Sequence, residues 1–193
     1  GNTVLVWLGF NGFNWEVQGR LLMAGEWQDV VSLSPPGQQA SAPQAVMDAN
    51  GVATLVWSQF NGISNVVQSI RHRRGVWGTV TNVSAIEQDT KLPQLAVDSA
   101  GNITVVWMQA NGVIFNIQGR RWNSADGWGA ITPLSSVSEN ANTPMITGNR
   151  AGSAIAIVKK DQAENLKQKV GEIYREKVGY DASFYDAEIV DGP

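Results

Sequence analysis

The chain has 193 residues, 43% of them hydrophobic, which is enough apolar side chain to fill one sizeable core or two small ones. The absence of cysteine excludes disulfides and thiolate metal sites and leaves the cellular compartment open. The formal net charge of -3 argues against a general nucleic-acid binder, and no apolar run approaches the roughly 18 residues that span a bilayer, so neither nucleic acid nor membrane is an expected partner.

One segment occurs three times, at intervals of 50 residues. It reads GNTVLVWLGFNG at 1–12, GVATLVWSQFNG at 51–62 and GNITVVWMQANG at 101–112. Each copy is a run of β-forming residues with a Trp near its end, followed by Asn-Gly, a dipeptide that favours a tight hairpin turn. The spacing therefore predicts an internal β repeat.

Each unit of the repeat is expected to hold four short antiparallel strands. The first opens at a proline, Pro43 or Pro93, and ends in an acidic turn. The second is the Trp strand, which is apolar on both faces and must be covered on both sides. The third follows the Asn-Gly turn, and the fourth begins at Trp27, Trp77 or Trp128 after a glycine. Such sheets favour blades stacked face to face around an axis.

We therefore expect a mainly β fold with about three propeller-like, four-stranded antiparallel blades. They are placed at about 1–42, 43–92 and 93–143, and a further blade opens at 144. The pattern Pro-Gln-x-x-x-Asp-x-x-Gly-x-x-x-x-Val-Trp, with a later glycine just before another Trp, resembles tandem repeats of bacterial β-propeller proteins. The resemblance covers 1–151. Many such proteins are secreted or surface-borne, so an extracellular or cell-surface location is expected for the repeats.

The number of blades is too small for a closed ring. Closed propellers need ~4 to 8 blades, whereas this sequence supplies strands two to four of a first blade, two whole blades and the opening of another. Two chains could form a six-bladed ring, or an open stack could leave edges that invite association. We therefore expect a homo-oligomer in which self-association completes the propeller.

The last 42 residues differ in composition from the rest. They hold 14 of the 31 charged residues and none of the eight tryptophans, so we place a boundary near Ala151. The pattern beyond it predicts a strand over 154–158, a helix over 161–179 and a last strand over 183–190. Residues 152–193 are therefore expected to form a strand-helix-strand α/β tail.

A string that begins just before this tail and runs through it can be compared with a known family. It comprises TG at 147–148, GSAIAIVKK at 152–160, FY at 184–185 and DG at 191–192. It resembles the C-terminal end of galactokinases, members of the GHMP kinase family. The family's glycine run reads GNRAG here, at 148–152, and its ATP-phosphate loop and catalytic acid have no counterpart. Because phosphoryl transfer needs groups that hold the phosphates and the metal, we expect a natural or engineered fusion without kinase activity.

Candidate ligand-binding residues are aromatic and polar side chains on or beside the third strands. An indole can pack against a sugar ring, while amides and guanidinium groups can hydrogen-bond its hydroxyls. Under the alternative, the glutamines satisfy backbone groups between blades, the arginines are solvated and the tryptophans lie in the core. The candidates are Trp15, Trp122, Gln18, Gln68, Gln118, Arg20 and Arg120.

Other chemistry-bearing residues are expected to be structural. Asp48 and Asp98 stand in Asp-x-x-Gly turns, where capping is favoured over calcium binding. The single histidine, His72, lies in the basic run RHRR and is expected in a solvated loop. No catalytic residue, cofactor or metal site is expected.

The function that this pattern favours is a non-enzymatic binding or interaction scaffold. Carbohydrate is the leading ligand, because repeated blades offer multivalent shallow sites rich in Trp, Gln and Asn. Two alternatives stay open. The chain is a fragment or fusion with only a structural, self-assembling role, or it is an inactive remnant of a sugar kinase.

Overall fold

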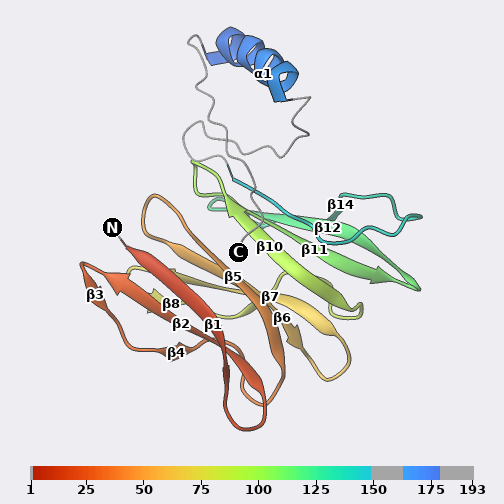
Figure 1. Cartoon of the computed structure of the whole chain (residues 1–193). Coiled ribbons are helices and arrows are strands. Elements are labelled where there is room, and N and C mark those ends of the chain that lie inside the picture. Colours follow the sequence, from red (N-terminus) through yellow and green to blue (C-terminus); the bar gives the residue numbers. More distant parts are fainter. Residues whose placement is uncertain (1, 149–162, 179–193) are drawn as a thin grey trace, which may run out of the picture. The chain divides into compact units, whose positions relative to one another are not determined.

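The computed structural model describes residues 2–148 and 163–178 (Figure 1). The chain divides into two compact units, Gly1–Ala154 and Ile155–Pro193. The described part of the first unit is built from strands, and that of the second is one helix.

Three antiparallel sheets make up the described part of the first unit, two of them five-stranded with the same strand order and one four-stranded (Figure 1). Sheet A contains β1 (Thr3–Phe10), β2 (Trp15–Met23), β3 (Glu26–Trp27) and β4 (Val31–Ser32). Sheet B contains β5 (Ala40–Met47), β6 (Ala53–Phe60), β7 (Asn65–Arg73), β8 (Val76–Trp77) and β9 (Thr81–Asn82). Sheet C contains β10 (Thr90–Val97), β11 (Ile103–Asn111), β12 (Ile114–Asn123), β13 (Gly127–Trp128) and β14 (Thr132–Pro133). The expected mainly β fold of about three antiparallel, propeller-like blades is confirmed.

The outermost strand of every sheet is broken into two short pieces. In sheet B the order is β5-β6-β7-β8, and β9 also pairs with β7. Sheet C repeats this order from β10 to β14, whereas sheet A begins with the Trp strand β1. The strand registers of the three sheets are equivalent, because a Trp on the Trp strand lies opposite a Gln on the next strand in each sheet. These pairs are Trp7 with Gln18, Trp57 with Gln68 and Trp107 with Gln118.

The Asn-Gly dipeptides form the tight turns predicted from the sequence. Between β6 and β7, Gly62 has a φ of 97°, in the left-handed region that favours glycine. The Asn61 Oδ1 accepts hydrogen bonds from the backbone N–H groups of Ile63 and Ser64, both at 2.9 Å. The side chain therefore caps its own turn and fixes the hairpin.

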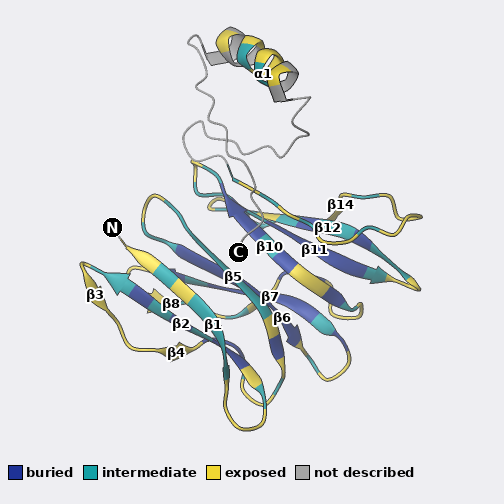
Figure 2. Cartoon of the chain, viewed as in Figure 1, coloured by how far each residue is buried: buried dark blue, intermediate teal, exposed yellow. Residues whose placement is uncertain are grey.

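The core consists of two apolar layers, each between neighbouring sheets (Figure 2). In the first layer Val17 and Leu21 of β2 pack with Leu55 of β6. In the second layer Val67 of β7 packs with Val105 of β11. Sheet B therefore buries both of its faces, as an apolar Trp strand requires.

Two of the recurring tryptophans are fully buried and held by a polar bridge. Trp57 is 0% exposed, and its Nε1 donates to Gln59 Oε1 at 3.0 Å. The Gln59 Nε2 in turn donates to the backbone carbonyl of Gln39 at 3.3 Å. The bridge repeats from Trp107 through Gln109. One glutamine thus satisfies a buried indole and ties the sheet to the chain entering its first strand.

The helix α1 spans Ala163–Val178. It confirms the helix predicted over 161–179, whereas the two predicted strands over 154–158 and 183–190 lie outside the described residues. Within α1, the Lys167 Nζ lies 2.8 Å from Glu164 Oε1, one turn away. Among the described residues, no helix combines the length and the apolar character that crossing a membrane requires.

The Trp57–Gln59 bridge can be tested by a double-mutant cycle. Trp57→Phe leaves the Gln59 oxygen without a donor, and Gln59→Leu leaves a buried indole N–H without an acceptor. Each change should therefore cost about 1–3 kcal/mol of unfolding free energy. The double variant should lose clearly less than the sum, measured by urea unfolding. Val113→Ala, at a fully exposed position, is the control and should change stability by less than about 0.5 kcal/mol. Additive losses would contradict the bridge.

Candidate ligand-binding cleft

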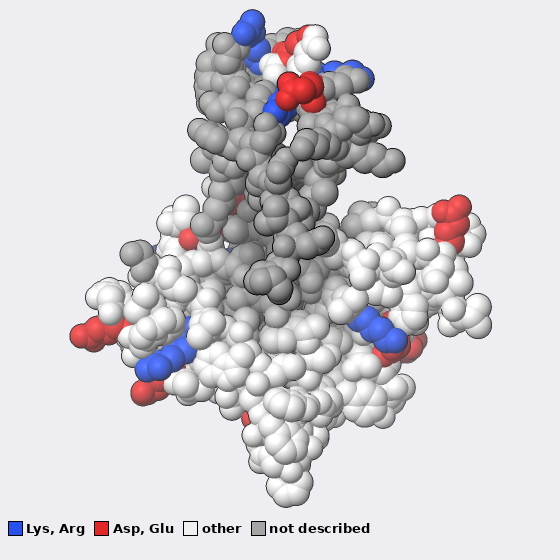
Figure 3. All heavy atoms as spheres, in the orientation of Figure 1, with Lys and Arg blue, Asp and Glu red and all other residues white. Residues whose placement is uncertain are grey.

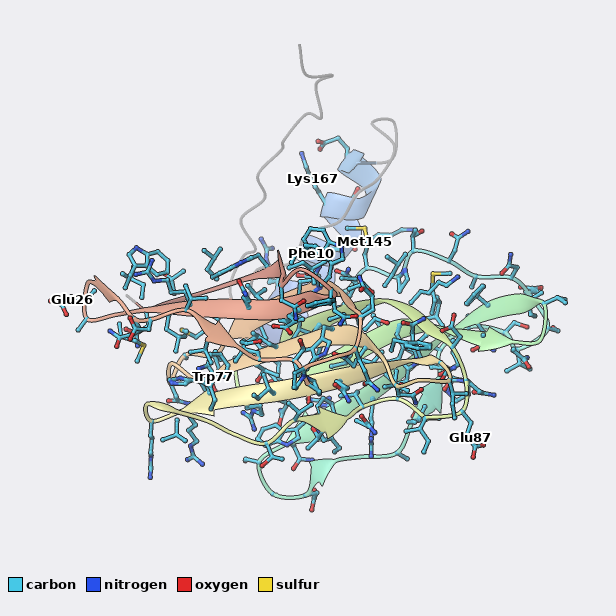
Figure 4. All side chains as sticks on the ribbon, turned by 90° about the horizontal axis from the view of Figure 1, so that it is seen from below. Phe10, Glu26, Trp77, Glu87, Met145 and Lys167 are labelled. Carbon is cyan, nitrogen blue, oxygen red and sulfur yellow. The ribbon has the colours of Figure 1, made fainter. Side chains whose placement is uncertain are left out.

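A cleft of about 410 Å³ lies where the outer strands of sheets A and B face each other. Its sheet A side is formed by Gly19, Arg20, Leu21, Met23, Gln28, Asp29 and Val31. Its sheet B side is formed by His72, Gly75 and Trp77. Trp77 is labelled in Figure 4, and its side chain also packs against the apolar layer between the two sheets.

A tight turn brings the histidine and the tryptophan together. Arg74 and Gly75 both have positive φ values, 52° and 83°, and they connect β7 to β8. The two strands then pair His72 with Trp77. The rings are 4.9 Å apart between centroids and tilted by 60°, an edge-to-face contact. The pair forms one wall of the cleft.

His72 is not in a solvated loop, and that expectation is wrong. It lies in β7 opposite Ala53, and only 3% of its surface is exposed. The equivalent positions are Leu22 in sheet A and Trp122 in sheet C, which pair with the corresponding residues of β1 and β11. Strand alternation therefore turns the imidazole toward the neighbouring sheet.

The environment of His72 favours the neutral ring. Burial lowers its pKa below the ordinary value, and the Gly75 backbone carbonyl opposes this shift only in part. Its Nδ1 is buried and has no hydrogen-bond partner among the described residues. A neutral imidazole carries one nitrogen that accepts a hydrogen bond, so this buried Nδ1 is an acceptor without a donor among the described residues.

The sheet A side of the cleft adds further polar groups. The Asp29 side chain is exposed there. The Gln28 amide makes one long hydrogen bond, from its Nε2 to the Glu26 carbonyl at 3.4 Å. The Arg20 Nε donates to the Gln28 carbonyl at 2.5 Å, which fixes the segment that carries Asp29. An apolar wall with a few convergent polar groups is the usual composition of a small-ligand site.

The aromatic and arginine candidates are spread over the unit. Trp15 is 44% exposed and packs against Phe10, with ring centroids 5.2 Å apart. Trp122 is covered by the Arg71 guanidinium, 3.4 Å from its ring. Arg20 is among the residues around the cleft, but it lies opposite Leu5, on the other face of β2 from Leu21, which packs against sheet B. The Arg120 guanidinium instead donates to the backbone carbonyls of Asn82 and Val83, at the outer end of sheet B.

The three glutamine candidates make structural contacts. The Gln18 Oε1 accepts from the Trp7 indole at 3.0 Å. The Gln68 Nε2 donates to Asn82 Oδ1 at 3.0 Å, and the Gln118 Nε2 lies 3.4 Å from Asn116 Oδ1. Of the seven candidates only Arg20 is among the residues around the cleft, and contact of any of them with a ligand stays a prediction.

The acidic turns are capped as the sequence predicts. The Asp98 Oδ1 accepts from the backbone N–H groups of Ala100 and Asn102, and its Oδ2 lies 2.7 Å from the Arg121 guanidinium. The Asn102 side chain is the main cause of a lowered Asp98 pKa, with smaller contributions from these amides and from Arg121. No group of three or more His, Asp or Glu that could hold a metal occurs in the described part of the chain.

Comparison with known proteins gives matches to part of the chain, although no protein-family model matches it. It is 94% identical over 49 residues to a galactokinase of Limosilactobacillus fermentum, which covers 25% of this chain and 13% of the relative. It is 63% identical over 67 residues to a galactokinase of Limosilactobacillus reuteri, covering 31% of this chain and 17% of the relative. The chain thus spans less than a fifth of these relatives' length. Galactokinase homology of a partial segment is confirmed.

These matches contradict the prediction that the chain is not an enzyme. Both relatives carry the name of an enzyme, and the identity over the shared segment is high. Similarity to solved structures is low. An α-L-arabinanase of Penicillium chrysogenum complexed with arabinobiose aligns with a TM-score of 0.49 and 12% identity, over 72% of this chain and 46% of that one. An α-L-arabinofuranosidase of Fusarium graminearum with arabinobiose also gives 0.49, with 10% identity and the same coverage.

Burial of His72 makes a prediction about acid stability. A histidine whose pKa is lowered by folding contributes stability above its ordinary pKa of about 6.5 and loses it as the pH falls through that range. Because His72 is the only histidine, the melting temperature should fall between pH 7.5 and pH 5 more steeply in the wild type than in His72→Leu. Circular dichroism melts would show this. Equal pH dependence of the two proteins would contradict the buried neutral ring.

Proposed function

We propose that the three-sheet unit binds a carbohydrate in the cleft between sheets A and B. The observation that carries this proposal is a cleft of about 410 Å³ lined by Trp77 and by His72, whose buried Nδ1 has no hydrogen-bond partner among the described residues. Small-ligand sites typically occupy about 300–1,000 Å³ and combine apolar walls with a few polar groups. The volume of the cleft lies in this range, and its lining combines Trp77 and Leu21 with polar side chains.

The chemistry of a sugar suits these walls. A pyranose presents C–H groups on its faces and hydroxyls at its edge, so it needs an aromatic surface and hydrogen-bonding groups around it. Trp77 supplies the surface, and the His72 Nδ1 supplies an acceptor for a hydroxyl. The Asp29 carboxylate accepts two further hydroxyls from the opposite wall. These groups converge from two sheets, which allows the cleft to discriminate among sugars by hydroxyl position.

Galactose is the first sugar to test. The relatives that share a segment with this chain are galactokinases, and their name supports galactose as the sugar unit. The occurrence of a β repeat unit and a galactokinase-like segment in one chain also supports a fusion of two origins.

Self-association is a second proposal, favoured by one exposed side chain. Leu5 of β1 is 51% exposed, whereas its equivalents Leu55 and Val105 are both 0% exposed. Leu5 is therefore an exposed apolar side chain on a face that also carries Gln18 and Arg20, and a further copy of the chain would cover it.

Carbohydrate binding can be tested with a matched pair of tryptophan variants. Calorimetric titration with galactose and galactose-containing oligosaccharides should detect binding by the wild type. Trp77→Ala should weaken it at least about tenfold, which is 1.4 kcal/mol, and Asp29→Asn should weaken it without unfolding the exposed segment. Trp27→Ala is the control, since Trp27 stands at the equivalent place in sheet A and does not line the cleft. Absence of binding to every sugar of a glycan array would overturn the proposal.

A further inference from the structure

One end of the three-sheet unit carries apolar side chains that protrude into solvent. In each sheet the residue that follows the Asn-Gly dipeptide is apolar, and these residues are Phe13, Ile63 and Val113. They are 89%, 86% and 100% exposed. Figure 1 shows the three turns that carry them, after β1, β6 and β11, along the lower and right margin of the unit. Turn positions are usually polar, and such exposed side chains add nothing to the core, so folding does not explain their recurrence.

The loop beside each of two turns adds a second exposed apolar residue. Ile86 is 54% exposed and Val137 is 58% exposed. The Asn61 Nδ2 donates to the Ile86 carbonyl at 3.2 Å, and the Asn111 Nδ2 donates to the Val137 carbonyl at 3.1 Å. The same asparagines begin the hairpin turns, so turn and loop are held together. We call these two residues and the three turn residues the tip surface, which comprises Phe13, Ile63, Ile86, Val113 and Val137.

Two turns of the tip surface are capped by their own side chains. The Asn11 Oδ1 accepts from the backbone N–H groups of Phe13 and Asn14, at 2.9 and 2.8 Å. Asn61 caps the next turn in the same way. A contact through fixed turns costs little conformational entropy, so more of its apolar burial remains as affinity.

The charge around the tip surface argues against an anionic partner. None of the five segments that form or flank it contains Lys, Arg or His; these segments are 10–15, 60–64, 84–89, 110–115 and 134–140. They do contain Glu87, Asp89 and Glu139. In Figure 3 the tip of the β1–β2 hairpin, at the bottom of the view, carries no charged side chain. Acidic lipids and nucleic acids bind basic groups, so a partner of this surface is uncharged or zwitterionic.

The shapes of the three turn residues favour a fluid partner. Phe13 is aromatic, whereas Ile63 and Val113 are β-branched and differ in size, so the copies share apolar character but not shape. The core of a protein interface is packed as densely as a protein interior, which requires a fixed shape at each contact. Stacked sheets are about 10 Å apart, so the turn residues are also separate projections. A lipid layer closes around separate projections of any shape.

We propose that the tip surface binds a zwitterionic lipid bilayer, with Phe13, Ile63 and Val113 inserted among its headgroups and upper acyl chains. This contact needs no spanning segment, because only side chains at turns enter the lipid. It also leaves the cleft free, since Gly75 and Trp77 lie at the other end of β7 from the Ile63 turn. Binding through three single side chains is weak and reversible, as it is for one acyl chain.

An aromatic pair behind the first tip suits this depth. Phe10 is 58% exposed and Trp15 is 44% exposed, and their ring centroids are 5.2 Å apart. They lie opposite each other where β1 ends and β2 begins. Tryptophan is enriched at the level of lipid headgroups, and the pair lies at that level when Phe13 enters the acyl chains.

Flotation with phosphatidylcholine vesicles tests the contact. The wild type should float with the vesicles. The triple variant Phe13→Ser, Ile63→Ser, Val113→Ser should bind at least about a hundredfold more weakly, because burial of each apolar side chain is worth about tenfold. Its melting temperature should change little, since the three positions are exposed. A wild type that does not float, or a triple variant that floats like the wild type, would overturn the proposal.

The matched control is Val76→Ser. It removes an apolar residue that is 67% exposed but follows the turn at the other end of β7, so this variant should float like the wild type. Adding anionic phosphatidylglycerol to the vesicles should not strengthen the binding of any of these proteins. Binding that requires the anionic lipid would contradict a contact made by the tip surface.

A fluorescent label reports insertion directly, since the chain has no cysteine of its own. Ile63→Cys carrying an environment-sensitive dye should shift its emission to the blue when phosphatidylcholine vesicles are added. The same dye on Val76→Cys should not respond, because that end stays in water. An equal response of the two labels would rule out insertion through the turns.

Light scattering without lipid separates the bilayer from a second copy of the chain. The triple variant should have the same mass as the wild type, because the tip surface is not a contact between copies. Leu5→Lys places a charge on the face proposed for self-association, so it should reduce an oligomer to single chains and still float like the wild type. A triple variant of lower mass than the wild type would show that the turns face another copy, and would overturn the lipid contact.

Discussion

The fold depends on strands that are apolar on both faces and can be stable only between two neighbours. Trp57 and Trp107 are 0% exposed because β6 and β11 each lie between two strands and beneath a neighbouring sheet. The indole of each is also tied through a glutamine to the chain that enters its sheet, so burial and strand order are specified together. In sheet A the position of Gln59 is taken by Gly9, so no glutamine links the tryptophan to the preceding chain. The Trp7 indole donates to Gln18 instead, and Trp7 is only partly buried.

The cleft is a product of the same stacking. Sheets pack closely along their long inner strands, whereas their outer strands are short and broken, so space is left between the outer parts of sheets A and B. Strand alternation then places His72 on the face that carries Leu55 and Ile70, where its buried Nδ1 has no hydrogen-bond partner among the described residues. A buried, unsatisfied acceptor is costly to the fold, and a ligand hydroxyl in the cleft would satisfy it.

Much of the architecture could be predicted from the sequence, because the 50-residue spacing, the Asn-Gly turns and the apolar Trp strands are local signals. The helix was predictable for the same reason. The cleft was not, because Asp29 and Trp77 come from different sheets and meet only after stacking. His72 was misassigned because its basic neighbours indicated a loop, while its place in the alternation of β7, opposite Ala53, indicated burial. The chain was predicted not to be an enzyme because the sequence shows no catalytic motif. This prediction is wrong, since the relatives that share a segment with the chain are named as enzymes.

Hydrogen exchange of the indole N–H groups, followed by NMR on a dilute sample of the Leu5→Lys variant, tests the two-sided burial most directly. Trp57 and Trp107 should exchange only with global unfolding, because their N–H groups are bonded and fully buried. Trp7, on the open face of sheet A, should exchange much faster. Equal and rapid exchange at all three positions would contradict the stacking of the sheets and with it the rest of this account.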